Sequence, residues 1–422
     1  MSALEHAAPA ATHAAPRLSR PFVAALMLAN FGTNVALIAP IQNVLPRMIE
    51  AAGWSGGKAL GLGLVTGLGA FAALIANPVA GHYSDRFVGR DNRAVTVLIG
   101  MVTGGVAHVI LGMQHSIVDI AVWWTICQAT INIAYGPMSA IVVDHVDRRS
   151  WGLVWGLISV AQALGLIIGL AAVVYVFPSV SAGMTAISVG YVLCLIPLLV
   201  VLYRLPRVSY EPAGTTGASR PGIRALLSLE QGFGLVWAGK FLVTLAETVA
   251  LLYLYYYVQD VVRYRNPGQG QVILVLAATL AAIVATVAVG RFADLSGGYR
   301  RYAVLSSVLM AATGFVLAGF AAWALVITCA LALGAGYGAF QSVSQALSMV
   351  VLPSPANAGR DLGIINIASA VPQVIGAPIA GLVVAGAGGY RGLFVFAGLL
   401  ALAAAVVFSR VPPSSDAAPS AT

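Results

Sequence analysis

Long apolar stretches dominate this chain of 422 residues and limit it to one kind of fold. Hydrophobic residues make up 59% of the sequence and charged residues only 9%, against about 45–50% and about 25% in soluble domains. A stretch of about 20 apolar residues crosses the hydrocarbon layer of a membrane as a helix. The composition therefore excludes a soluble domain, a disordered chain and a disulfide scaffold, and it predicts an all-α integral membrane protein.

Clusters of proline, glycine and charged residues divide the chain into twelve predicted transmembrane helices. They cover residues 22–46, 60–81, 94–114, 117–142, 152–176, 182–203, 232–258, 270–290, 303–322, 324–350, 363–385 and 391–410. The even number places both termini on one side, whose loops and tails carry sixteen basic residues against five on the other side. Because basic residues favour cytoplasmic loops, we expect a cell-membrane protein with cytoplasmic termini, and its net charge of +8 does not indicate nucleic-acid binding.

The sequence predicts two pseudo-symmetric bundles of six helices, at residues 22–203 and 232–410, joined by a cytoplasmic linker at 204–231. Residues 1–21 and 411–422 are predicted to be disordered tails. Short patterns recur between the halves at offsets of 209 and 211 residues: Gly81 and Asp85 at Gly290 and Asp294, and Arg149, Gly152, Gln162 and Gly165 at Arg360, Gly363, Gln373 and Gly376. Such parallel repeats are one design of secondary transporters.

Side-chain amides are absent from the cores of the third, sixth, ninth and twelfth predicted helices, which we therefore expect on the outside. Lipid cannot hydrogen-bond an amide, so the amides of the other helices should face protein or a watery cavity. We expect a cavity between the first, fourth, seventh and tenth helices, with a contribution from the eleventh. The predicted solute-binding residues are Asn30, Asn34, Trp124, Gln128, Asn132, Tyr337, Gln341, Gln345 and Asn366. The alternative is that the amides only join helices through interhelical hydrogen bonds.

Two charged residues, Lys240 and Glu247, lie on one face of the seventh predicted helix. A carboxylate in the middle of a span is a functional candidate, so Glu247 is the first predicted proton-coupling group and Lys240 the second. The alternatives are a static ion pair, and a lysine side chain that reaches the membrane surface. We expect His108 to serve packing, and the tyrosines at 253 and 255–257 to form an aromatic belt at the outer membrane surface.

The sequence contains no arrangement of residues typical of catalysis. It has no CxxC, HExxH or GxxxxGK[ST] pattern, so we predict neither an enzyme nor an ATP-driven pump. No cofactor or metal site is expected. The predicted partners are a small-molecule solute, protons and the lipid bilayer, and the protein is expected to function as a monomer.

The loop after the second predicted helix reads GHYSDRFVGRDNR, and GRFADLSGGYRR echoes it after the eighth. At this point the chain resembles the major facilitator superfamily, whose loop motif is G-x-x-x-D-[RK]-x-G-[RK]-[RK]. The resemblance covers the whole chain and implies alternating access, with Asp85 contacting the start of the eleventh helix and Arg90 pairing with Asp144. It implies a cytoplasmic gate made of Gly81, Asp85, Arg86, Gly89, Arg90, Asp144 and Asp294.

Parts of the chain resemble two different branches of this superfamily. The segment RDLGIINIASAVPQ, residues 360–373, resembles the sucrose/proton symporters, whereas Gly156, Gly165 and Gly169 resemble half of the antiporter motif of drug and metabolite exporters. We expect proton-coupled transport of a small organic solute, and favour export because the charges of the symporter branch are absent from the first helix. Uptake of a saccharide-like neutral solute is the alternative, and a non-transporting receptor on the same scaffold is an alternative of another class.

Overall fold

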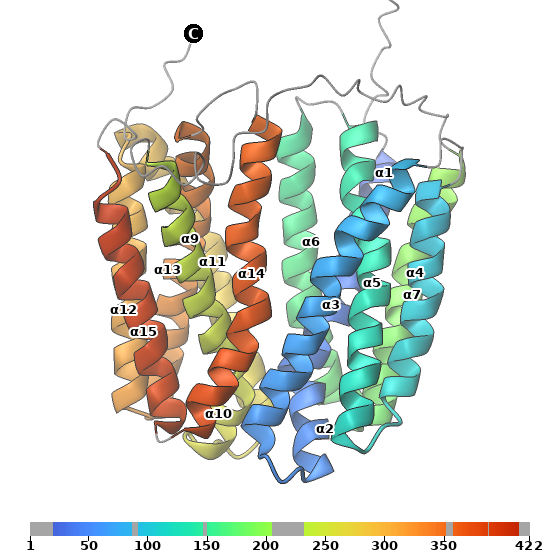
Figure 1. Ribbon diagram of the computed structural model, residues 1–422, viewed down its shortest axis with the longest axis horizontal. Helices are drawn as coiled ribbons and strands as arrows, with labels where there is room; N and C mark the ends of the chain where they lie inside the picture. The colour runs from blue at the N-terminus through green and yellow to red at the C-terminus, as the bar shows by residue number, and fades with distance from the viewer. Residues whose placement is uncertain are drawn as a thin grey trace, which may run out of the picture.

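The computed structural model describes residues 20–86, 92–146, 150–204, 232–351, 358–386 and 388–412 (Figure 1). Twelve helices in this part of the chain are long and apolar enough to cross a membrane, which confirms the predicted number of spans and the all-α fold. The first helix begins and the last one ends at the same end of the bundle, at the top of Figure 1. We call this the terminal end, and the opposite end the distal end.

The first half contains six spans, and π-helical turns extend the first and the fifth. Its elements are α1 (Arg20–Ala39), η1 (Pro40–Val44), α2 (Leu45–Ala52), α3 (Lys58–Arg86), α4 (Asn92–Leu111), α5 (Ile117–His145), α6 (Trp151–Ala171), η3 (Ala172–Val176) and α7 (Val180–Arg204). The second half consists of α9 (Phe233–Leu252), α10 (Leu254–Asp260), α11 (Pro267–Ser296), α12 (Tyr299–Gly319), α13 (Trp323–Val350), α14 (Ala358–Ala385) and α15 (Gly389–Ser409).

The two halves pack their helices in the same pattern. In the first half α3 packs on α5, α4 on α5 and α7, and α1 on α6 and α7. In the second half α11 packs on α13, α12 on α13 and α15, and α9 on α14 and α15. The halves meet along two seams, α3 with α14 and α6 with α11, which are exchanged by the repeat. This correspondence supports the internal repeat seen in the sequence.

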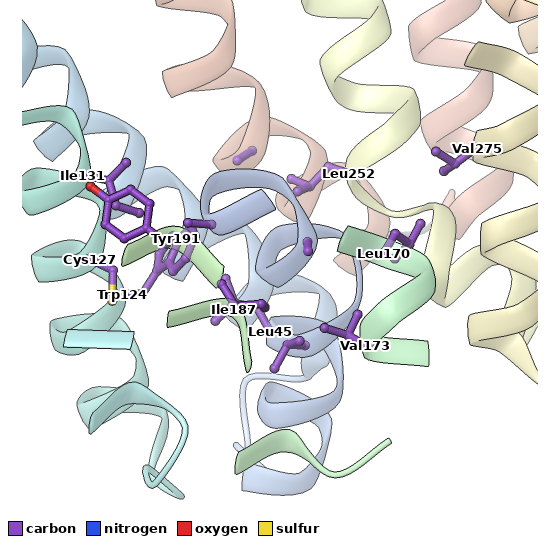
Figure 2. Close-up of a cluster of buried hydrophobic side chains, with 14 of the residues drawn as sticks. Leu45, Trp124, Cys127, Ile131, Leu170, Val173, Ile187, Tyr191, Leu252 and Val275 are labelled. Carbon is purple, nitrogen blue, oxygen red and sulfur yellow. The ribbon is translucent and has the colours of Figure 1, made fainter. Parts of the chain in front are cut away.

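The core of the first half is built from apolar side chains of several helices. Figure 2 shows Trp124 and Ile131 of α5 beside Ile187 and Tyr191 of α7, and all four are buried. His108 of α4 is also fully buried, with its ring nitrogens 2.8 Å from the carbonyl oxygen of Gly104 and 3.1 Å from that of Ala36 on α1. The packing role expected for His108 is therefore confirmed.

Two expectations for the seventh span are wrong. A continuous helix is predicted over 232–258, but α9 ends at Leu252 and α10 begins at Leu254. The predicted aromatic belt is instead a buried cluster, because Tyr253, Tyr255, Tyr256 and Tyr257 are each at most 8% exposed. The hydroxyls of Tyr253, Tyr256 and Tyr257 donate to backbone carbonyl oxygens inside the protein, so these rings pack between helices rather than against lipid.

Close packing of α11 on α13 depends on two glycines. A Cβ atom added at Gly334 would overlap the backbone of Ala278, and one added at Gly338 would overlap the backbone of Ala282. Neither obstacle is a flexible side chain, so the two helices would have to move apart. Small residues commonly allow such close contact between membrane helices.

We predict that Gly334→Ala lowers the midpoint of thermal unfolding of the detergent-purified protein, because overpacking costs about 1–3 kcal/mol. The matched control is Gly190→Ala in α7, where an added Cβ meets no atom within 4 Å. The control should leave the midpoint unchanged or raise it slightly, since alanine is the better helix former by up to about 1 kcal/mol. Equal effects of the two substitutions would contradict the packing argument.

Candidate functional site

A cavity of about 790 Å³ lies between the two halves. Its walls come from α1, η1, α3, α5 and α6 of the first half and from α9 and α14 of the second. This volume is within the range of about 300–1,000 Å³ that is usual for small-molecule sites. Among the described residues, α4, α7, α12 and α15 contribute nothing to its walls.

The cavity wall is polar without being charged. Six side-chain amides line it, together with the hydroxyls of three threonines and one tyrosine: Asn34, Asn77, Gln128, Asn132, Gln162 and Gln373, with Thr33, Thr66, Thr248 and Tyr135. Leucine, isoleucine and valine side chains form most of the remainder. Within the part of the chain that the structure describes, no Asp, Glu, Lys or Arg belongs to this lining. Such a site suits a neutral solute with both polar and apolar surface.

The cavity is closed toward the distal end. Its lining residues on that side, such as Thr66, Leu252 and Ala377, are buried. Lining residues nearer the terminal end, such as Leu74 and Pro78, are exposed. The cavity therefore opens on the side where the chain begins and ends.

An ionic cluster closes the distal end, and we call it the distal latch: Glu50, Lys58, Gln259, Asp260 and Tyr390. The Lys58 ammonium lies 3.0 Å from Glu50 Oε1 and 2.8 Å from Asp260 Oδ1. Gln259 donates to both carboxylate oxygens of Glu50, and the Tyr390 hydroxyl donates to Asp260 Oδ2. Glu50 and Lys58 belong to the first half and the other three to the second, so the cluster joins the halves.

Tyrosine hydroxyls and amides form a second layer of contacts between the halves. The hydroxyl of Tyr253 donates to the carbonyl oxygen of Ala59 at 2.8 Å, and that of Tyr256 donates to the carbonyl oxygen of Pro46 at 2.7 Å. Gln271 of α11 donates to the backbone and side-chain oxygens of Gln42 at 2.7 and 2.9 Å. These bonds also lie at the distal end, beneath the cavity.

Neither Glu50 nor Asp260 stands out in the sequence by itself, but the internal repeat relates them. They are 210 residues apart, between the offsets of 209 and 211 that relate the other repeated residues. Comparing acidic residues across the repeat would therefore have identified the two carboxylates that meet at Lys58.

Three of the predicted solute-binding residues, Asn34, Gln128 and Asn132, lie in the cavity wall. Asn30 is 4% exposed and accepts a hydrogen bond from Gln162, while Trp124 is fully buried behind the wall. On α13, Tyr337, Gln341 and Gln345 are outside the lining, and the two glutamines are exposed. Asn366 belongs to α14, but its side chain is not among those described. The second, fifth and eleventh spans thus line the cavity where α13 was expected.

The predicted coupling residues lie on α9 beside the cavity. Glu247 is partly buried and adjacent in sequence to Thr248, which lines the cavity. It also lies close enough to Tyr337 of α13 for the two to interact electrostatically. Lys240 is only 3% exposed. Among the described residues, neither Lys240 nor Glu247 has an ion pair.

The predicted gate residues lie at the terminal end. Gly81, Asp85 and Arg86 are in the last turns of α3 and Asp144 in the last turn of α5, whereas Gly89 and Arg90 are outside the described residues. The side chains of Asp85, Arg86 and Asp144 are also outside them. Asp294 of α11 is exposed and accepts a hydrogen bond from the hydroxyl of Tyr299 at 2.8 Å.

Sequence comparison identifies the family of this chain. A sequence model of the Major Facilitator Superfamily matches residues 21–278 and 236–422, which together include all twelve spans. The chain belongs to the Major Facilitator Superfamily. No curated protein sequence matches it. Membership identifies the protein as a multi-pass membrane transporter rather than an enzyme, built to work by alternating access.

Solved structures share the fold of this superfamily member. The nucleoside transporter NupG is 14% identical, with a TM-score of 0.66 and coverage of 92% of this chain and 98% of that one. A bacterial homolog of the human lysosomal transporter Spinster, inward-facing and occupied, is 13% identical with a TM-score of 0.70, covering 95% and 100%. A POT family transporter in complex with 5-aminolevulinic acid is 12% identical with a TM-score of 0.73, covering 93% and 96%.

We predict that Lys58→Ala opens the distal end. Both carboxylates of the latch lose their counter-ion. If the closed state is stabilised by about 1 kcal/mol less, the ratio of open to closed molecules rises about fivefold. The measurement is the rate at which an impermeant maleimide, added from the distal side of membrane vesicles, labels a cysteine introduced at Ile41 in the cavity wall. Cys127, Cys194 and Cys329 are replaced by serine beforehand.

The matched control for this prediction is Asp119→Asn. Asp119 is an exposed carboxylate in the first turn of α5 at the same end, and among the described residues it bonds only with Ser116, just before that turn. The labelling rate of the Asp119→Asn variant should equal that of the parent, and the rate of the Lys58→Arg variant should stay near it. An unchanged rate in Lys58→Ala would show that the latch does not hold this end closed.

Proposed function

We propose that this protein couples the movement of a small neutral organic solute to the movement of protons across the cell membrane. The observation that carries the proposal is the uncharged, amide-lined cavity between the halves, which the latch closes at one end only. A cavity that is open on one side is what alternating access requires at one stage of its cycle. The solute binds the amides there and leaves on the other side after the halves rock.

The terminal end faces the cytoplasm in this proposal. Sixteen basic residues belong to that side and five to the distal side, as the positive-inside rule requires of a protein with cytoplasmic termini. The cavity then opens inward, and the distal latch faces the outside of the cell. The predicted gate residues at the terminal end, which include Asp85, Arg90 and Asp144, form the corresponding inner gate, which closes when the latch opens.

Glu247 is the proposed proton-coupling group. It lies in a span, next to a residue of the cavity wall, and the described residues give it no counter-ion. An unpaired carboxylate at that depth is costly once water leaves the cavity, so closure around the solute favours its protonated form. Lys240, about 10 Å away along the same helix, supplies a positive charge on the same face and is the second coupling candidate.

The direction of transport is proposed from the sequence, which favours export of a metabolite or drug. The uncharged wall is equally suited to the alternative, uptake of a saccharide-like neutral solute. The lining therefore restricts the chemical class of the solute but does not favour either direction of transport. Transport assays in both directions separate these two cases.

We predict that Glu247→Gln abolishes accumulation of the solute driven by a pH gradient in proteoliposomes but leaves solute exchange at equal pH. Glutamine keeps the shape and polarity of the side chain but does not exchange a proton, so the drop in accumulation should be at least tenfold. Sucrose, D-glucose and uridine are suitable neutral probes, each tested with both polarities of the gradient. Asp119→Asn is the matched carboxylate control and should accumulate solute like the parent.

Two outcomes would reject this assignment. Accumulation by Glu247→Gln equal to that of the parent would remove Glu247 from coupling. Binding of a probe by the parent without any flux would favour the receptor alternative over a transporter.

A further inference from the structure

The polar groups of the cavity wall fall into those already bonded to the protein and those left free. Asn132 belongs to the first kind, because its Oδ1 accepts from Asn77 Nδ2 at 3.4 Å and its Nδ2 donates to the carbonyl oxygen of Gln128 at 2.8 Å. This amide holds α3 to α5 and has little bonding capacity left for a solute. The free groups gather instead on the neighbouring wall, where α1, α5 and α6 meet.

The orientation of Gln162 follows from a chain of hydrogen bonds anchored on the backbone. The carbonyl oxygen of Leu26 can only accept, so Asn30 must direct its Nδ2 toward it, at 2.9 Å. Asn30 Oδ1 then faces α6 and must accept, and Gln162 Nε2 donates to it at 3.2 Å. The same nitrogen donates to the Tyr135 hydroxyl at 3.2 Å. Both hydrogens of the Gln162 amide are therefore used, and its Oε1 is the atom left for a solute.

Three free groups follow from this arrangement. Gln162 Oε1 is an acceptor without a donor among the described residues, and the Tyr135 hydroxyl, which already accepts, has a hydrogen to donate. Asn34 Oδ1 is a third group, a buried acceptor with no hydrogen-bond partner among the described residues. All three side chains line the cavity. Leaving a buried acceptor such as Asn34 Oδ1 unpaired costs about 1–3 kcal/mol, so it favours a ligand that completes it. Gln162 and Tyr135 are only partly buried, and they offer their free groups to the same ligand.

The three groups are also close together. A Cβ atom added at Gly165 would lie 3.3 Å from Asn34 Cβ, and Gly165 is one helical turn from Gln162 on α6. Tyr135 is bonded directly to Gln162. Two acceptors and one donor thus lie side by side on adjoining helices, in a wall whose described residues carry no charge.

We propose that Asn34, Gln162 and Tyr135 form a subsite for two adjacent hydroxyl groups of a neutral solute, held in position by Asn30. A vicinal diol presents two O–H donors to the two amide oxygens and an oxygen acceptor to the tyrosine hydroxyl. A site built to bond a hydroxyl discriminates strongly against an analogue that lacks it, because its own buried groups are then left unpaired. This inference deepens the proposed function by naming the class of solute.

The repeat provides a matched control for this subsite. Gln373 of α14 is the counterpart of Gln162 in the second half and also lines the cavity. It is exposed, and the described residues give its side chain no hydrogen bond comparable to those of Gln162. A glutamine of equal size and similar depth therefore differs from Gln162 in lacking a fixed orientation.

The test measures binding to the purified full-length chain by thermal stabilisation and equilibrium dialysis. The probes are sucrose, D-glucose, uridine and its analogue 2′-deoxyuridine, which lacks the vicinal diol of the ribose, together with the cation tetraphenylphosphonium and the anion p-aminohippurate. We expect the strongest binding from a diol, weaker binding from its deoxy analogue, and a loss of about 10–100-fold in Gln162→Leu and in Asn34→Leu. Gln373→Leu removes an amide of the same wall that has no fixed orientation, and its loss of affinity should be at least threefold smaller than that of Gln162→Leu.

Several results would overturn the proposal: binding of the charged probes alone, no binding of any diol, equal binding of uridine and 2′-deoxyuridine, or equal losses in Gln162→Leu and Gln373→Leu. The unliganded melting temperature of each variant shows whether it is folded, and Gln162→Asn, which shortens the side chain but keeps the amide, should lose less than Gln162→Leu. Failure of the transport proposal can be distinguished from failure of the subsite proposal. A protein that binds diols through Gln162 without transporting them has the subsite and lacks only the flux.

Discussion

The hydrocarbon layer offers no hydrogen-bond partner, and this constraint determines where the polar side chains of the protein lie. Helices satisfy the backbone within each span, so each amide or hydroxyl side chain must find a partner inside the protein or in water. Six amides line the cavity between the halves, and Gln42, Asn43 and Gln271 bond across the distal contact beneath it. These amides therefore mark the surface along which the two bundles meet, and that surface is where a solute can bind.

Internal duplication explains both the symmetry of the scaffold and the way it is closed. The same helix pairs pack in each half, and the two seams between halves exchange under the repeat. Glu50 and Asp260 are counterparts in this repeat, yet both bind the single ammonium of Lys58. One basic residue thus joins two equivalent acids from opposite halves. Opening the distal end must leave at least one of them without its counter-ion, at a depth where water can replace it.

Local sequence was sufficient to predict the number of spans and the packing of His108 inside the first half. It was also sufficient to predict that Asn34, Gln128 and Asn132 lie in the cavity wall. It was insufficient where distant contacts decide the outcome. The break at Tyr253 interrupts an apolar run, and its hydroxyl bonds to a carbonyl 194 residues away. Aromatic residues near a span end fit a lipid interface and a buried contact equally well. Periodicity identifies the polar face of α13 but not the helices that it meets.

The contacts made by Tyr253 and Tyr256 have a consequence for how this protein tolerates change. Each hydroxyl donates to a main-chain carbonyl of the opposite half, that of Ala59 or of Pro46. Every amino acid carries such an acceptor, so replacing the side chain at either accepting position does not remove it. Recognition between the bundles at these points therefore depends on the path of the backbone and on the two tyrosines, and not on the side chains of the accepting residues.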